Sequence, residues 1–208
     1  MCYSGHAQGT FQNLNFESAS IVPVSNSAHY PYEVYTSSAV PGWTVYREQS
    51  QQNTMIHNTQ SLSGSSISIY DTASREHQPI AGNYSVYLLG SASSMAPISV
   101  SIAQSGNIAS DVQSLRFRAW GSNFDVRLNG QSLALVPLSS SDNHTVYGAD
   151  ISSFAGTFGE LRFTAQHAGS VLLDSINFSP VAVPEPNILT VATAGIGLLL
   201  LVRRASRR

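Results

Sequence analysis

Hydrophobic and polar residues alternate with a period of two along much of residues 9–180, and no sustained helical period appears. Alternation of this kind predicts strands with one buried face. The cleanest examples are ISVSIAQ at 98–104 and LRFRAW at 115–120. Clusters of Ser, Gly, Asn and Pro separate the alternating segments and predict turns. The strands predicted in this way cover residues 11–16, 43–47, 67–70, 85–89, 98–104, 115–120, 145–151, 161–165 and 171–178.

The segment FDVRLNGQSLALVPL (124–138) predicts a hairpin with Asn129-Gly130 as its two-residue turn. Asn-Gly favours such turns because both central residues must adopt a positive φ. About ten strands and no helix in about 170 residues predict an all-β fold. We expect an antiparallel two-sheet sandwich of the jelly-roll type over residues 9–182.

The C-terminal segment, residues 183–208, has a different pattern. Ile188 to Val202 form an uncharged, largely apolar run, and arginines follow at 203–208. As a helix the run would be about 22 Å long, against a hydrocarbon core of about 30 Å. It predicts a short transmembrane helix whose arginines snorkel to the cytoplasmic side, which places residues 9–182 outside the inner membrane. A buried core helix is the alternative.

This tail resembles the PEP-CTERM sorting signal of Gram-negative bacteria. The residues that carry the resemblance flank the apolar run, and they are Val183, Pro184, Glu185, Pro186, Arg203 and Arg204. The resemblance implies an exosortase-type transpeptidase as partner, cleavage near the motif, and delivery to the cell surface or an exopolysaccharide matrix. Residues 1–8 lack the apolar region of a signal peptide and are expected to be a residual or truncated one.

Composition separates the body from the tail. Charged residues make up 11% of the chain, which has no lysine and a net charge of −2. Residues 1–182 have six Arg and eleven acidic residues, hence −5, whereas residues 183–208 have four Arg and one Glu, hence +3. An acidic body excludes a basic nucleic-acid footprint. With Cys2 as the one cysteine, no disulfide can form within the chain.

Three motifs of the body resemble galactose-binding-like β-sandwich domains, the fold of many carbohydrate-binding modules. They are NLNFES (13–18), VPGWTVY (40–46) and LLDSINFSP (172–180). In such domains the terminal strands often meet at a structural calcium ion, so the resemblance implies Glu17 and Asp174 as carboxylate ligands. Ordinary hydrogen bonds made by both carboxylates are the alternative.

Aromatic residues suggest a sugar platform. HYPYEVY (29–35) places Tyr30, Tyr32 and Tyr35 in one predicted loop, where flat rings could stack on sugars. The alternative is that these rings are buried. Trp43 and Trp120 lie within predicted strands, and we expect both to be anchors of the core.

No catalytic constellation is visible, because the sequence has no G-x-S-x-G elbow, P-loop or paired metal-binding histidines. The leading hypothesis is therefore a non-enzymatic surface or matrix protein that binds polysaccharide. A purely structural matrix protein is the second hypothesis, and it predicts buried tyrosines at 30, 32 and 35. A polysaccharide hydrolase or lyase is the third, and it requires a cleft with two carboxylates.

Overall fold

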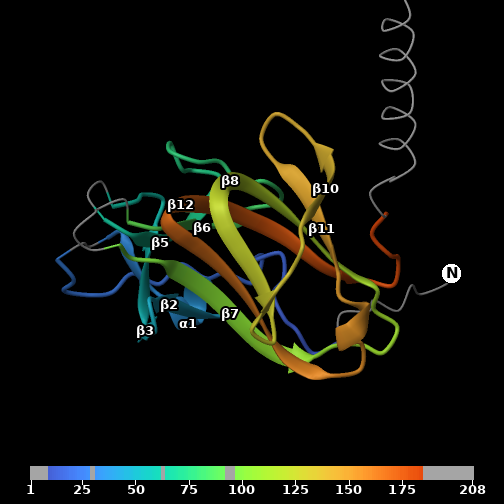
Figure 1. Ribbon diagram of the computed structural model, residues 1–208. Helices are drawn as coiled ribbons and strands as arrows, with labels where there is room; N and C mark the ends of the chain where they lie inside the picture. The colour runs from blue at the N-terminus through green and yellow to red at the C-terminus, as the bar shows by residue number, and fades with distance from the viewer. Residues whose placement is uncertain (1–8, 29–30, 62–63, 92–96, 185–208) are drawn as a thin grey trace, which may run out of the picture.

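The computed structural model describes residues 9–28, 31–61, 64–91 and 97–184, and these form an all-β fold (Figure 1). One α-helical turn, α1 (Thr36–Ala39), and one 3₁₀ turn, Ser152–Phe154, interrupt the strands. The strands are β1 (Glu33–Tyr35), β2 (Thr44–Arg47), β3 (Ser50–Gln52), β4 (Thr54–His57), β5 (Ser66–Asp71), β6 (Tyr84–Leu89), β7 (Val100–Asn107), β8 (Ser114–Leu128), β9 (Gln131–Ser132), β10 (Val136–Ser140), β11 (Thr145–Asp150) and β12 (Phe158–Ser179).

Two long strands, β8 and β12, organise the sheet. β12 pairs with β8 along most of its length, with β7 over its first part and with β6 over its second. A register shift between Ala165 and Ser170 separates these parts. The first part of β12 belongs to the strand order β3-β2-β7-β12-β8-β9. Its second part belongs to the strand order β1-β4-β5-β6-β12-β8-β11-β10. We call these the first and second layers.

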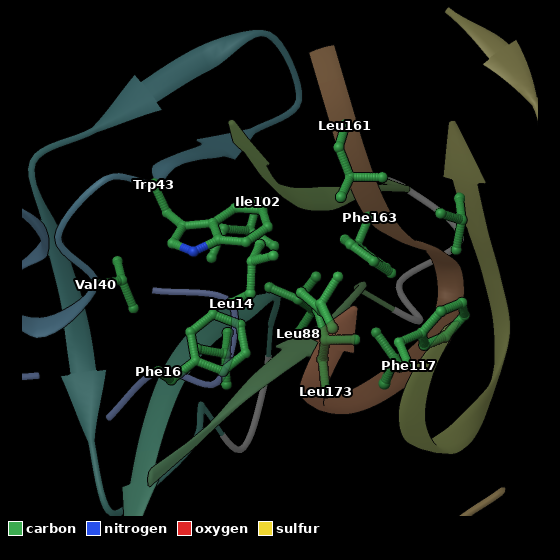
Figure 2. Close-up of a cluster of buried hydrophobic side chains, with 14 of the residues drawn as sticks. Leu14, Phe16, Val40, Trp43, Leu88, Ile102, Phe117, Leu161, Phe163 and Leu173 are labelled. Atoms are coloured by element: carbon green, nitrogen blue, oxygen red, sulfur yellow. The ribbon is translucent and has the colours of Figure 1, made fainter. Parts of the chain in front are cut away.

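The core fills the space between the two layers (Figure 2). Phe163 and Ile102 of the first layer and Leu88, Leu173 and Phe117 of the second belong to one buried cluster. The alternating pattern placed these side chains inward, and the predicted all-β sandwich is confirmed at this level. Burial of about 25 cal/mol per Å² of apolar surface makes this cluster the main source of stability.

Several predicted elements differ from the observed ones. Residues 11–16 form no strand, because Asn13 and Phe16 have positive φ values of 48° and 60° and turn the chain. The segments 161–165 and 171–178 belong to one strand, β12, that is bent between them. Among the described strands, β4 and β5 form a parallel pair, whereas the prediction was an antiparallel sandwich.

The Asn129-Gly130 hairpin is confirmed. Both residues have positive φ, 54° and 79°, and Leu128 pairs with Gln131 across the turn. Within the described residues no helix is long and apolar enough to cross a membrane. The predicted transmembrane helix at 188–202 lies outside the described residues, and the domain boundaries at 8 and 182 stay predictions.

Candidate functional site

Trp120 is a surface residue, with 46% of its area exposed, and its prediction as a core anchor is wrong. The reason lies in the alternation of β8. Leu115, Phe117 and Ala119 face the core, so Trp120 falls on the outer face of the strand. Trp43, in contrast, is 5% exposed and belongs to the core, as predicted.

Trp120 ends a cluster of rings on the outer face of the second layer. It pairs with Leu172 of β12, which in turn pairs with Tyr87 of β6. The imidazole of His77 lies over this row, with ring centroids 5.6 Å from Trp120, 4.7 Å from Tyr87 and 5.2 Å from Tyr70. Burial lowers the pKa of His77 below its usual 6.5, and Glu76 opposes this only in part.

Residues from two connections line a hollow together with Trp120. The β5–β6 connection supplies Glu76, His77 and Gln78, and the β10–β11 turn supplies Asp142 and Asn143. With Trp120 and Leu172 they line a hollow of about 290 Å³. We call it the Trp120 hollow. Among the described residues that line it, two are carboxylates and none is a permanent cation.

Trp120 also lines a second hollow, of about 330 Å³. Gly121, Ser122, Thr145 and Ser170 are among the residues that line it. Trp120 therefore lines both hollows, and hydroxyl and amide groups are among their other lining residues. Such an arrangement offers an apolar face for stacking and polar groups that fix the orientation of a ligand.

Glu76 is held from two sides. Its Oε2 accepts a hydrogen bond from the Tyr70 hydroxyl at 2.9 Å, and its Oε1 accepts one from the Thr59 hydroxyl at 3.0 Å. Burial of Tyr70, followed by this bond to a carboxylate, raises the pKa of the phenol far above its usual value. The phenol therefore stays protonated and keeps donating. These bonds fix the loop that carries His77 and Gln78.

The structure describes two of the three tyrosines of the predicted sugar platform. Tyr32 and Tyr35 are 53% and 41% exposed, which contradicts the burial that a purely structural role predicted, whereas Tyr30 lies outside the described residues. Tyr32 borders a hollow of about 480 Å³, the Tyr32 hollow, together with Ile56, Thr59, Gln60 and Ser65. Tyr35 is not among its described lining residues.

Glu17 and Asp174 bind neighbouring parts of one loop. Glu17 accepts from the backbone N–H groups of Asn83 and Tyr84 at 2.8 and 3.0 Å. Asp174, 1% exposed, accepts from Ala81 N at 3.0 Å and from the Ser85 hydroxyl at 2.7 Å. Burial raises the pKa of Asp174 above its usual value, although these donors oppose the rise.

These N–H and O–H donors bond to the carboxylate oxygens, as the alternative of ordinary hydrogen bonds expects. No group of three or more His, Cys, Asp or Glu gathers within the described part of the chain. Calcium binding by Glu17 and Asp174 stays a prediction.

The sorting motif is described only at its start. Val183 and Pro184 follow β12, whereas Glu185, Pro186, Arg203 and Arg204 lie outside the described residues. The chain before the motif is fastened to β8, because Arg116 donates to the carbonyls of Val181 and Ala182 at 3.2 Å. The exosortase partner and the inner membrane stay predictions.

Sequence reasoning missed the Trp120 hollow, although one signal was present. In LRFRAW the indole has the same parity as the two arginines, which indicates the solvent side. No comparable signal marks Gln78, Asp142 or Asn143, because only the tertiary fold brings their loops together.

No family model matches the chain, and no curated protein is significantly similar to it. Among solved structures, TmCBM61 in complex with β-1,4-galactotriose has a TM-score of 0.46 and 10% identity, over 83% of this chain and 98% of that one. The K2 cleaved adhesin domain of Lys-gingipain has a TM-score of 0.43 and 13% identity, over 85% and 99%. A β-glucosidase from Kluyveromyces marxianus in complex with glucose has a TM-score of 0.30 and 8% identity, over 81% and 18%. At these identities the likeness concerns the general arrangement of strands alone.

Proposed function

We propose that this chain is a non-catalytic carbohydrate-binding protein and that the Trp120 hollow is its sugar site. The observation that carries the proposal is a half-exposed tryptophan that lines a hollow together with five polar or charged side chains. A large aromatic ring exposed on a soluble protein costs solvation free energy, which a stacked ligand recovers.

The chemistry of the walls favours a neutral glycan. The apolar C–H face of a pyranose ring fits the indole, while Gln78 and Asn143 can donate to and accept from hydroxyl groups. Glu76 and Asp142 add acceptors and repel an anionic sugar. Uronate polymers are therefore expected to bind more weakly than uncharged ones.

The sequence of the tail supports the proposed location. The motif at 183–186, the apolar run at 188–202 and the arginines at 203–208 fit an exosortase substrate of a Gram-negative bacterium. In this proposal the helix holds the protein transiently in the inner membrane, and the galactose-binding-like sandwich then reaches the cell surface or matrix. A sugar site suits that destination.

Binding of the full chain to a defined panel tests the proposal. The panel comprises β-1,4-glucan, β-1,4-galactan, amylose, laminarin and, as the anionic member, alginate. We expect retention on at least one neutral polymer and its loss in Trp120→Ala. Phe158→Ala is the matched control, because Phe158 is an exposed aromatic residue, 65% exposed, that lines neither hollow beside Trp120. Equal retention of both variants, or none by the native chain, would refute the proposal.

Hydrolysis is a second candidate, because Glu76 and Asp142 line the same hollow. Glycoside hydrolysis needs two carboxyl groups on either side of the scissile bond. Both oxygens of Glu76 already accept hydrogen bonds, which favours the binding role. Release of reducing ends from the panel, abolished in both Glu76→Gln and Asp142→Asn, would establish hydrolysis and overturn the non-catalytic proposal.

A further inference from the structure

The Trp120 hollow lies at one end of a row that crosses six strands of the second layer. The central members of this row are buried, so it gives the distance between the two ends and is not itself a binding surface. Residues in register along this row are Trp120, Leu172, Tyr87, Ser68, Ile56 and Glu33. Neighbouring strands lie about 4.8 Å apart, so five steps make the row about 24 Å long. Tyr32, which borders the other hollow, directly precedes Glu33 at the far end.

Glu76 and Thr59 connect the two hollows. Glu76 lines the Trp120 hollow and Thr59 lines the Tyr32 hollow, and their side chains are hydrogen-bonded to each other at 3.0 Å. The hydrogen bond between Thr59 and Glu76 therefore joins the walls of the two hollows. A long ligand that leaves Trp120 over the exposed Glu76 and passes Thr59 reaches the hollow that Tyr32 borders.

The Tyr32 hollow contains polar atoms that lack partners. Gln60 Oε1 and Ser65 Oγ are buried, and neither has a hydrogen-bond partner among the described residues. A buried polar atom without a partner costs about 1–3 kcal/mol. Once the two side chains turn toward the hollow, sugar hydroxyls can supply a donor to the amide oxygen and a partner to the serine hydroxyl, beside the exposed ring of Tyr32.

We infer that one polysaccharide chain occupies both hollows, with sugars at Trp120 and Tyr32 and an extended segment over Glu76 and Thr59 between them. This inference rests on the proposed function. The expected ligand is an internal stretch of an uncharged polymer. A single terminal sugar would need the Trp120 hollow alone.

Affinity as a function of ligand length tests the inference. Calorimetry of the full chain uses mono-, tri- and hexasaccharides of β-1,4-glucose, β-1,4-galactose, α-1,4-glucose and β-1,3-glucose. A trisaccharide is too short to span both hollows, whereas an extended hexasaccharide is long enough. We expect the hexasaccharide of the preferred series to bind at least tenfold more tightly than the trisaccharide.

Variants assign the gain to the Tyr32 hollow. Tyr32→Ala and Gln60→Ala should each remove most of the gain with length and leave trisaccharide binding unchanged. Tyr35→Ala is the matched control, because this exposed tyrosine is not among the described residues of that hollow. The inference would be overturned if affinity rose with ligand length equally in Tyr32→Ala, Gln60→Ala and the native chain, or if it did not rise in the native chain at all. The proposed function would survive either result as long as Trp120→Ala abolishes binding. If Trp120→Ala has no effect or nothing binds, the proposed function fails first and the inference with it.

Discussion

Phenylalanine substitution of each tryptophan separates a buried indole from an exposed one. In the core, Trp43 lies with ring centroids 5.8 Å from Phe16 and 6.4 Å from Phe163, and its Nε1 donates to the Asn13 carbonyl at 3.0 Å. That hydrogen bond holds the irregular N-terminal segment against the sandwich. Trp43→Phe therefore removes both packing and a link to this segment.

The magnitude follows from burial. The change from indole to phenyl removes roughly three methylene equivalents, or about 2.4 kcal/mol at about 0.8 kcal/mol each. Loss of the donor to the Asn13 carbonyl adds about 1 kcal/mol. We expect Trp43→Phe to lower the free energy of unfolding by about 3–4 kcal/mol and the Tm by about 10 °C. Trp120→Phe should cost only about 1 kcal/mol, because half of the indole is already in water.

Urea denaturation of the full chain, followed by far-ultraviolet circular dichroism, measures both values. The two variants carry the same chemical change, so each serves as the control for the other. A loss below 1 kcal/mol for Trp43→Phe, or an equal loss for both variants, would refute the assignment of Trp43 to the core and Trp120 to the surface.

Four further predictions concern titration, metal binding and the tail. The lowered pKa of His77 means that stability is full above pH 6.5 and falls as the pH drops through the folded pKa, whereas His77→Phe loses this slope in denaturation measurements. The raised pKa of Asp174 has the opposite effect, because its contribution to the free energy of unfolding is full below about pH 3.8 and is lost as the pH rises through the pKa of the folded state. The native chain should therefore lose stability relative to Asp174→Asn over that range of pH. If Glu17 and Asp174 bind calcium, the ion added to EDTA-treated protein should raise the Tm of the native chain but not that of Glu17→Gln. An unchanged Tm of the native chain would mean that both carboxylates act only as hydrogen-bond acceptors. Alanine replacement of Pro184, Glu185 and Pro186 should leave the protein uncleaved in the inner membrane on fractionation, and normal processing of that variant contradicts the sorting hypothesis.

The fold was predictable where period-two alternation continues without interruption. It located β5, β6, β7 and β11, and the Asn-Gly turn located the hairpin that follows β8. It could not predict that β8 and β12 continue through bends, because a bend shifts the parity of the pattern and looks like a loop. The N-terminal segment was misassigned because Phe11, Leu14 and Phe16 are all buried, although positive φ values prevent a strand.

The candidate site was less predictable than the fold. The parity of Trp120 was readable, yet an aromatic residue in an alternating strand is usually taken as core. Its partners His77 and Asp142 come from connections more than twenty residues away from it on either side. Their proximity depends on the strand order β6-β12-β8-β11, which local sequence patterns do not contain.

Glu17 and Asp174 connect the sequence-based hypotheses with the proposed sugar site. Together they accept hydrogen bonds from four of the five residues 81–85, namely Ala81, Asn83, Tyr84 and Ser85. A Cβ at Gly82, whose φ is +61°, would collide with the Glu17 carboxylate, so this approach requires glycine. The clamped segment is the end of the connection that carries Glu76, His77 and Gln78. The two carboxylates therefore act as positioning residues for one wall of the Trp120 hollow, and their loss should weaken sugar binding without contact between either residue and the sugar.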